Sequence, residues 1–162
     1  MTNALLVKIT RYVSLLGSGV VAGGALATLI LELALRRLSG PDYVEVRQAE
    51  HDWFPWYIGA TLGPTFVAVA VLVLLAWRTG SPALRPAAAA FVLLVLALVL
   101  SFAVNAPINL AQVDWNAQTP PADWAGIRDR WQIAHGIRTA FCAISFGFVG
   151  VAVIDRPFGR AS

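Results

Sequence analysis

The sequence predicts an all-α fold, a four-helix transmembrane bundle that forms one domain over residues 1–162. Composition indicates a membrane protein, because 58% of the residues are hydrophobic and only 13% are charged. In soluble domains about a quarter of the residues are charged. Four apolar stretches are also long enough to cross the hydrocarbon core, which takes about 20 helical residues. These predicted spans are residues 14–35, 56–77, 86–104 and 133–154.

The first span begins after Lys8 and Arg11, and its small residues at 25–27 resemble a signal-peptide cleavage site. The apolar run continues to Leu35, past the usual length of a signal core. We therefore expect it to be retained as a span. At helical spacing its small and polar residues gather on one face: Ser14, Ser18, Ala25, Thr28 and Glu32.

Glu32 lies inside the apolar run of this first span. An ionisable group at that depth has two explanations, and the sequence leaves both open. The carboxyl is functional, or it is neutralised by Arg36 one helical turn later. If both chain ends lie on one side of the membrane, Glu32 would come within reach of His135 or Arg138 at the start of the fourth span.

Small residues four positions apart occur in three of the predicted spans. We interpret them as packing contacts inside the bundle, because small side chains let membrane helices approach closely. The same spacing also occurs at helix dimer faces, so a homo-oligomer is left open. The pairs are Gly19 and Gly23, Gly59 and Gly63, and Ala143 and Gly147.

The connector between the first and second spans carries the string QAEHDWFPW at residues 48–56. Its tryptophans are typical of the aromatic belt that lies at headgroup depth. Gln48, His51 and Trp53 are also candidate substrate contacts, because they crowd together in this polar segment beside the membrane.

Pro107 follows the third span and stands between Asn105 and Asn109. Proline has no N–H and clashes with the carbonyl four residues earlier, so the helix is expected to end or kink there. The sequence leaves two uses open for the asparagines. They satisfy the backbone groups that the break exposes, or one amide faces a cavity and binds a substrate oxygen.

The fourth span carries the most informative pattern, a set of residues three or four apart that falls on one stripe of the helix. An arginine facing lipid costs about 2.5 to 3.5 kcal/mol at the centre of a span. We therefore expect the stripe to face the bundle interior or a wet cavity. The alternative is that its arginines reach the headgroups from the helix end. The stripe is Arg128, Trp131, His135, Arg138, Cys142 and Ser145.

Several classes of site are excluded or unsupported. The single cysteine, Cys142, excludes an internal disulfide and an all-cysteine metal site. His51 and His135 belong to no metal-ligand motif, so no cofactor is predicted and a metal is unsupported. The net charge is +3, but the arginines lie at helix ends and form no basic stripe with aromatic residues, which indicates no nucleic-acid partner.

Orientation follows from the basic residues, which divide evenly between the two sides. Those on the side of the chain ends lie in short segments with few acids, and this favours both termini in the cytoplasm. The four apolar spans make the lipid bilayer a predicted partner of the chain. The residues on that side are Lys8, Arg11, Arg78, Arg85, Arg156 and Arg160.

The second half of the chain carries a series of motifs: VNAPIN at 104–109, Trp115, PADW at 121–124, RDRW at 128–131, and His135 with Arg138 and Thr139. With these motifs the chain resembles the anthrone oxygenase family, whose members are small four-helix membrane proteins. The resemblance extends over most of the chain, because the glycine-rich first span and the glutamine-bearing connector are compatible with it.

The resemblance implies that dioxygen oxidises a fused-ring anthrone to an anthraquinone without a dedicated cofactor. Such a reaction needs a base, an anion stabiliser and a flat apolar pocket. His135 is the expected base, with Glu32 as the alternative, and Arg138 with Asn105 or Asn109 is expected to stabilise the oxyanion.

The remaining candidate residues would contact a small hydrophobic aromatic substrate. The tryptophans are expected to form the walls of the pocket. The rival hypothesis is a non-catalytic membrane protein that binds a lipid, a quinone or another small hydrophobic ligand, or that assists a partner. The candidate contacts are Trp53, Trp115, Trp131, Arg128, His51 and Gln48.

Overall fold

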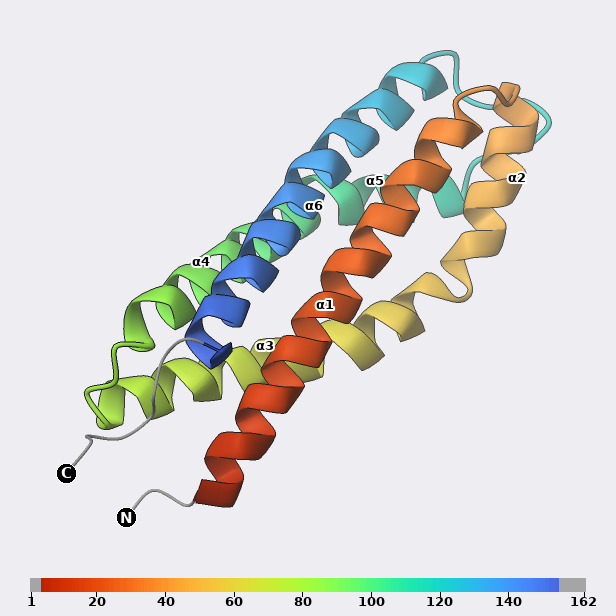
Figure 1. Ribbon diagram of the computed structural model, residues 1–162. Coiled ribbons are helices and arrows are strands. Elements are labelled where there is room, and N and C mark those ends of the chain that lie inside the picture. The colour runs from red at the N-terminus through yellow and green to blue at the C-terminus, as the bar shows by residue number, and fades with distance from the viewer. Residues whose placement is uncertain (1–3, 155–162) are drawn as a thin grey trace.

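The computed structural model describes residues 4–154, which form helices joined by short turns, with no strand among them (Figure 1). The predicted all-α fold class is therefore confirmed. Four helical runs are long and apolar enough to span a membrane. They are α1 (Ala4–Leu35), α3 (Phe54–Arg78), α4 (Leu84–Leu100) with its continuation into α5 (Ala106–Val113), and α6 (Trp124–Ile154).

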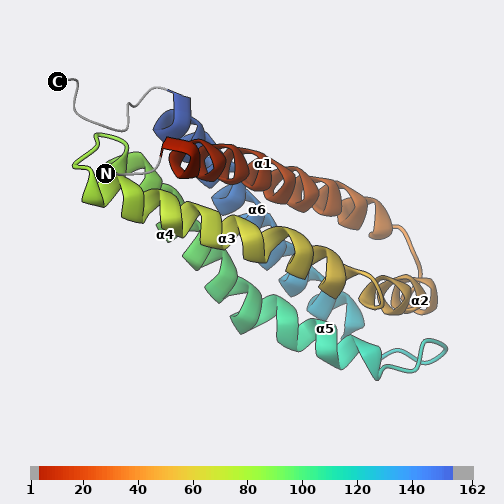
Figure 2. The same ribbon diagram turned by 90° about the horizontal axis from the view of Figure 1, so that it is seen from below.

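Each long helix packs against two others, so the bundle closes in the order α1, α3, α4, α6. The start of α1, the turn between α3 and α4, and the end of α6 lie together at one end, here called the terminal end (Figures 1 and 2). The helix α2 (Gly40–His51) lies at the opposite, connector end, beside α5. Which end faces the cytoplasm stays a prediction, and Arg156 and Arg160 lie outside the described residues.

Two long helices begin earlier than the hydropathy predicted. α1 starts at Ala4 and not at residue 14, and α6 starts at Trp124 and not at residue 133. Hydropathy detects only the apolar part of a helix, whereas backbone hydrogen bonding continues through polar turns outside the hydrocarbon core. The longer α6 matters for the site, because it places Arg128 and Trp131 within a regular helix.

Part of the first connector folds as α2. Ser39 is its N-cap, and the Ser39 hydroxyl oxygen accepts from the backbone N–H of Asp42 at 3.4 Å. Pro41 stands in the first turn, where a missing N–H costs nothing. The inner face of α2 buries Tyr43 and Arg47, which are 0% and 8% exposed. α2 thus brings a charged side chain into the bundle.

The third span does not stop at Pro107. Between α4 and α5 the helix widens into one π-helical turn, Ser101–Asn105, and then continues. The backbone N–H after this turn donates to the carbonyl of Ser101, five residues earlier. The wider turn accommodates a proline without ending the helix. The expected capping of exposed carbonyls by Asn105 and Asn109 is not observed, since both amides contact other helices.

The interior changes character along the bundle axis. The terminal half holds an apolar core of close-packed aliphatic side chains from α3, α4 and α6, whereas the connector half buries polar and charged side chains. Small residues let α4 and α6 lie close together. The apolar core is Val69, Leu72, Ala76, Ala83, Ala87, Ala90, Leu94, Val149, Ala152 and Val153.

Most of the predicted small-residue pairs do not mark close helix contacts. A Cβ atom added at Gly23, Gly59, Gly63 or Gly147 would meet nothing within 4 Å. Within those pairs, Gly19 is the glycine that meets a neighbour, with the Phe146 ring 3.3 Å from an added Cβ. α1 and α3 instead approach closely where an added Cβ would collide with a hydroxyl-bearing side chain of α3. These contacts are Gly17 with Thr65 and Gly24 with Tyr57.

Candidate functional site

The stripe on α6 faces the bundle interior, as its spacing predicted. Trp131 is 3% exposed and His135 is 1% exposed, and Arg128 and Cys142 are buried as well. Arg138 is partly exposed because its guanidinium borders a cleft. The stripe therefore does not extend outward from α6 to the headgroups.

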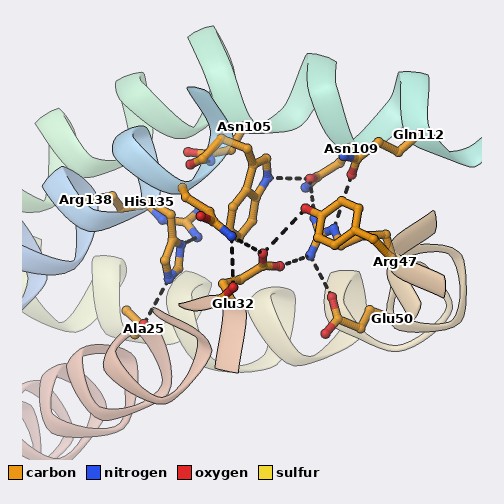
Figure 3. A network of polar contacts seen from close by, with 12 residues as sticks. Ala25, Glu32, Arg47, Glu50, Asn105, Asn109, Gln112, His135 and Arg138 are labelled. Atoms are coloured by element: carbon orange, nitrogen blue, oxygen red, sulfur yellow. Dashed lines mark hydrogen bonds and ion pairs between the residues drawn. The ribbon is translucent and has the colours of Figure 1, made fainter. Parts of the chain in front are cut away.

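A buried arginine from α2 connects two carboxylates (Figure 3). Arg47 Nη1 lies 2.8 Å from Glu32 Oε1 on α1 and 2.6 Å from Glu50 Oε2. The side chains of Glu32 and Arg47 are only 1% and 7% exposed. Gln132 Nε2 on α6 donates to Glu32 Oε2 at 3.1 Å, and the Tyr43 hydroxyl donates to the same oxygen at 3.5 Å. A buried charge with this many partners is stable where an unpaired one would not be.

Asn109 joins this ion cluster to the α6 stripe. Its Oδ1 accepts from Arg47 Nη2 at 2.9 Å and from Trp131 Nε1 at 2.6 Å. The Arg47 guanidinium lies over the Trp131 ring, 4.5 Å from its centroid. The Trp131 ring in turn stacks on His135, with centroids 4.8 Å apart and planes 11° from parallel. Polar contacts from Glu32 to Trp131, followed by the stacking of Trp131 on His135, therefore link the two ends of this network, and Figure 3 shows the polar contacts.

The hydrogen bonds of His135 define its tautomer. Nε2 lies 2.9 Å from the backbone carbonyl oxygen of Ala25, which can only accept, so Nε2 carries the hydrogen. Nδ1 then accepts from Arg138 Nη2. Arg138 Nη1 donates to Ser101 Oγ at 3.0 Å. Both ring nitrogens of His135 are thus committed, and the imidazole holds Arg138 in place.

A cleft with a volume of about 430 Å³ lies beside this network. Small-molecule sites commonly have volumes of about 300–1,000 Å³. The apolar part of its lining, here called the apolar wall, comes from α3, the π-turn and α5, and the polar part, here called the polar wall, comes from α2, α5 and α6. The apolar wall includes Phe54, Ile58, Phe102 and Leu110, and the polar wall includes Arg47, Glu50, His51, Asn109, Trp131 and Arg138.

Two groups of α2, which lies outside the membrane spans, have shifted pKa values. Burial, reinforced by the charge of Glu32, raises the pKa of the Tyr43 hydroxyl, which therefore stays protonated. Burial also raises the pKa of Glu50, although the Arg47 guanidinium acts in the opposite direction. A carboxylate with a raised pKa is a stronger base than an ordinary one. Glu50 is thus a basic group on the cleft wall.

Several predicted contact residues lie away from the cleft. Gln48 ties α2 to the end of α5, because its Nε2 donates to three backbone carbonyls, including that of Trp115 at 2.8 Å. The Trp115 side chain borders a separate groove with Pro107 and Arg130. Trp53 is 77% exposed and is not part of the cleft lining. Of the connector residues, His51 does line the cleft.

Arg128 and Asn105 also serve contacts within the fold. Arg128 Nη2 lies 3.0 Å from Asp129 Oδ1, and its guanidinium lies 5.0 Å from the Trp124 ring centroid. Asn105 is 2% exposed, and its Nδ2 donates to the backbone carbonyl of Trp131 at 3.1 Å. Neither side chain is in the lining of the cleft.

Glu32 has none of its predicted partners. Arg36 pairs with Asp129 at 3.1 Å and donates to Gln132 at 2.6 Å. The expected contact of Glu32 with His135 or Arg138 is not formed either, because α2 inserts Arg47 beside the carboxylate. The carboxylate is 0% exposed and lines neither the cleft nor the smaller cavity that His135 borders.

Sequence reasoning missed Arg47 and Glu50, the two charged residues that meet at the cleft wall. A signal for them was present at residues 39–42, where Ser-Gly-Pro-Asp has the composition of a helix start. Once α2 is assigned, Tyr43, Arg47 and Glu50 fall three or four apart on one face.

The two histidines border different cavities, His51 the cleft and His135 the smaller cavity on the other side of Arg138. Among residues 4–154, no three His, Cys, Asp or Glu side chains are close enough together to hold a metal ion.

Comparison with known proteins bears on these residues. The family model described as anthrone oxygenase matches residues 53–148, which is more than half of the 162 residues. This range includes Asn109, Trp131, His135 and Arg138, whereas α1 and α2 lie before it. No curated protein and no solved structure gives a significant match. The motifs between residues 104 and 139 predicted the same relationship, and the chain belongs to the anthrone oxygenase family.

Proposed function

We propose that the protein is a membrane-embedded oxygenase that converts an anthrone-type fused-ring phenol to a quinone with dioxygen. The observation that carries the proposal is the Arg47–Glu50 pair in a cleft that is also lined by aromatic and aliphatic side chains. A planar aromatic substrate would lie against Phe54 and Phe102 and present its oxygen to the polar wall. Membership of the anthrone oxygenase family supports this choice of substrate class.

Arg138 is the group that we assign to the substrate oxyanion. A guanidinium has five N–H donors. Arg47 makes four hydrogen bonds within the protein, to Glu32, Glu50, Asn109 and Gln112. Arg138 makes two, so within the described residues it keeps more donors for a ligand. Fixed donors in a site with little water stabilise developing negative charge strongly.

Glu50 is the group that we assign as the general base. His135 was the base expected from sequence, but both of its ring nitrogens are engaged. Glu32, the alternative base, does not border the cleft and has donors on both carboxylate oxygens. We therefore treat these two as positioning residues, Glu32 for Arg47 and His135 for Arg138. Glu50 Oε2 accepts from Arg47, which leaves Oε1 for a substrate proton.

The reaction balances without a further reductant. Glu50 removes a proton from the methylene carbon of the anthrone, and the resulting anion passes one electron to dioxygen. The carbon radical and superoxide then combine through a new C–O bond, and protonation gives a hydroperoxide. Loss of water from this hydroperoxide forms the second quinone carbonyl. Because the substrate supplies every electron, we propose that no dedicated redox cofactor takes part.

Oxygen uptake by the purified protein tests the proposal. In detergent or nanodiscs, an anthrone should be oxidised with one equivalent of dioxygen, faster than in protein-free buffer. Glu50→Gln should lower kcat by about 10²–10⁴, the usual contribution of a general base. Glu45→Gln on the exposed side of α2 is the matched control and should keep the wild-type rate.

Two results would overturn the proposal. Equal oxygen uptake by wild type and Glu50→Gln would reject Glu50 as the general base. A wild-type rate no higher than that of buffer would reject the proposed oxygenase activity. In the second case, saturable anthraquinone binding would favour a ligand-binding protein. Metal analysis of the same sample tests the cofactor-free mechanism, since activity that disappears with chelation and returns with metal would contradict it.

A further inference from the structure

A second pocket, here called the inner chamber, lies among α1, α3, α4 and α6 next to the cleft, and it is partly open at the bundle surface, where Tyr57 and Ile58 are 42% and 37% exposed. Its volume is about 70 Å³. Phe54, Ile58 and Arg138 border both the inner chamber and the cleft, so these side chains separate the two spaces. The chamber also borders His135, on the face of the network that a substrate in the cleft does not reach.

Three polar side chains on the chamber wall are engaged within the protein, whereas the Arg138 guanidinium, at the border with the cleft, keeps free donors. Thr61 Oγ1 donates to the carbonyl of Tyr57 at 2.8 Å, and Ser101 Oγ donates to the carbonyl of Ala97 at 2.7 Å. His135 Nε2 donates to the carbonyl of Ala25. A water molecule needs about two to four polar partners to remain in a cavity. Away from Arg138 these bonds leave few partners for water, so we expect that part of the chamber to be dry.

The size of the inner chamber sets what it can hold. Sites for drug-sized ligands are about 300–1,000 Å³, so a fused three-ring substrate does not fit in about 70 Å³. A diatomic gas does fit, and the remaining wall is largely hydrocarbon from Val21, Leu62 and Leu98. An uncharged gas that dissolves well in hydrocarbon is favoured in such a space, whereas water is not.

We propose that the inner chamber is the dioxygen site of the enzyme. This inference rests on the proposed function, and it adds that the two substrates occupy separate spaces on either side of Arg138. Electron transfer from the substrate anion in the cleft would create superoxide in the chamber. The Arg138 guanidinium borders both spaces and would stabilise that charge next to the carbon radical with which it combines.

Xenon binding tests the chamber without any catalysis, because xenon occupies dry apolar cavities. Methyl NMR under xenon pressure should show shifts at Leu62 and Leu98 that saturate as pressure rises. Leu96 lies on the exposed face of α4, at 44% exposure, and should show only a linear, unsaturated shift from xenon dissolved in the surrounding detergent. Linear responses at all three leucines would overturn the inference.

Kinetics provides the second test. Ala97→Leu should fill the chamber and raise KM for dioxygen by about tenfold, the lower end of what a hydrophobic pocket discriminates. KM for the anthrone should stay close to the wild-type value, since Ala97 does not line the cleft. Ala140→Leu places the same side chain on the exposed face of α6 and should leave both constants unchanged.

The two tests separate this inference from the proposed function. Saturable xenon binding in a protein with no oxygenase activity would reject the oxygenase and leave only an apolar gas cavity. An active oxygenase in which xenon does not saturate, or in which Ala97→Leu leaves KM for dioxygen unchanged, would reject the dioxygen site alone. Saturable xenon together with the selective rise in KM for dioxygen would support both.

Discussion

Replacement of Arg47 by methionine would remove the only cation within hydrogen-bonding distance of Glu32 among residues 4–154. The Glu32 side chain is 1% exposed and would keep neutral donors from Gln132 and Tyr43. Glu50, at 16% side-chain exposure, would lose its partner as well. A buried charge left without its counter-charge typically costs about 3–5 kcal/mol. We expect Arg47→Met to lower the free energy of unfolding by about that amount.

Glu32→Gln should cost less than Arg47→Met. The glutamine keeps an oxygen for Arg47, and Arg47 keeps its 2.6 Å ion pair with Glu50. Loss of one strong hydrogen bond under these conditions costs about 1–3 kcal/mol. The double variant should lose less than the sum of the two single losses, because Arg47→Met is harmful chiefly through the charge that Glu32→Gln removes.

Unfolding in mixed micelles, followed by tryptophan fluorescence, measures these differences. Arg37→Met is the matched control, since Arg37 follows α1 and is exposed. This control should change the free energy of unfolding by less than about 0.5 kcal/mol. A loss in Arg47→Met no larger than that of the control would refute the view that the buried ion cluster organises the site. Strict additivity in the double variant would do the same.

Three further predictions test other parts of the account. Gly24→Ala should destabilise the α1–α3 contact, because the added Cβ would lie 3.0 Å from the Tyr57 ring. Gly23→Ala is the control, because its added Cβ meets nothing within 4 Å, and it should stabilise α1 by up to about 1 kcal/mol. Thermal unfolding distinguishes the two variants. A base acts when deprotonated, so kcat/KM should rise with pH through the raised pKa of Glu50, and Glu50→Gln should remove that limb of the profile. Arg138→Leu should lower kcat by about 10²–10³, as loss of one oxyanion donor does elsewhere, in single-turnover assays.

The membrane spans and the inward stripe of α6 could be predicted because both depend on local periodicity. Hydropathy over about 20 residues identifies a span, and a charge facing lipid is costly enough to orient Arg138 and His135. On α1, Ser14, Ser18 and Glu32 share one face by their spacing, and the structure buries all three.

The partners of these residues could not be predicted in the same way. Glu32 and Arg47 are 15 positions apart and meet only because α2 folds back beside α1. The asparagine pair was placed at a helix end, but the chain passes Pro107 through a π-turn, so Asn109 turns toward Arg47 and Trp131. Neither feature leaves a periodic signal, since each depends on the tertiary arrangement of several helices.

The central claim is that Glu50, paired with Arg47 in the cleft, removes a proton from an anthrone. Proton removal can be measured without oxygen chemistry, as exchange of the methylene hydrogen of an anthrone with D₂O under anaerobic conditions, followed by NMR. We predict exchange well above the buffer rate for wild type and for Ala97→Leu, and loss of that enhancement in Glu50→Gln. Exchange at the buffer rate with wild type, or undiminished exchange in Glu50→Gln, would contradict the claim.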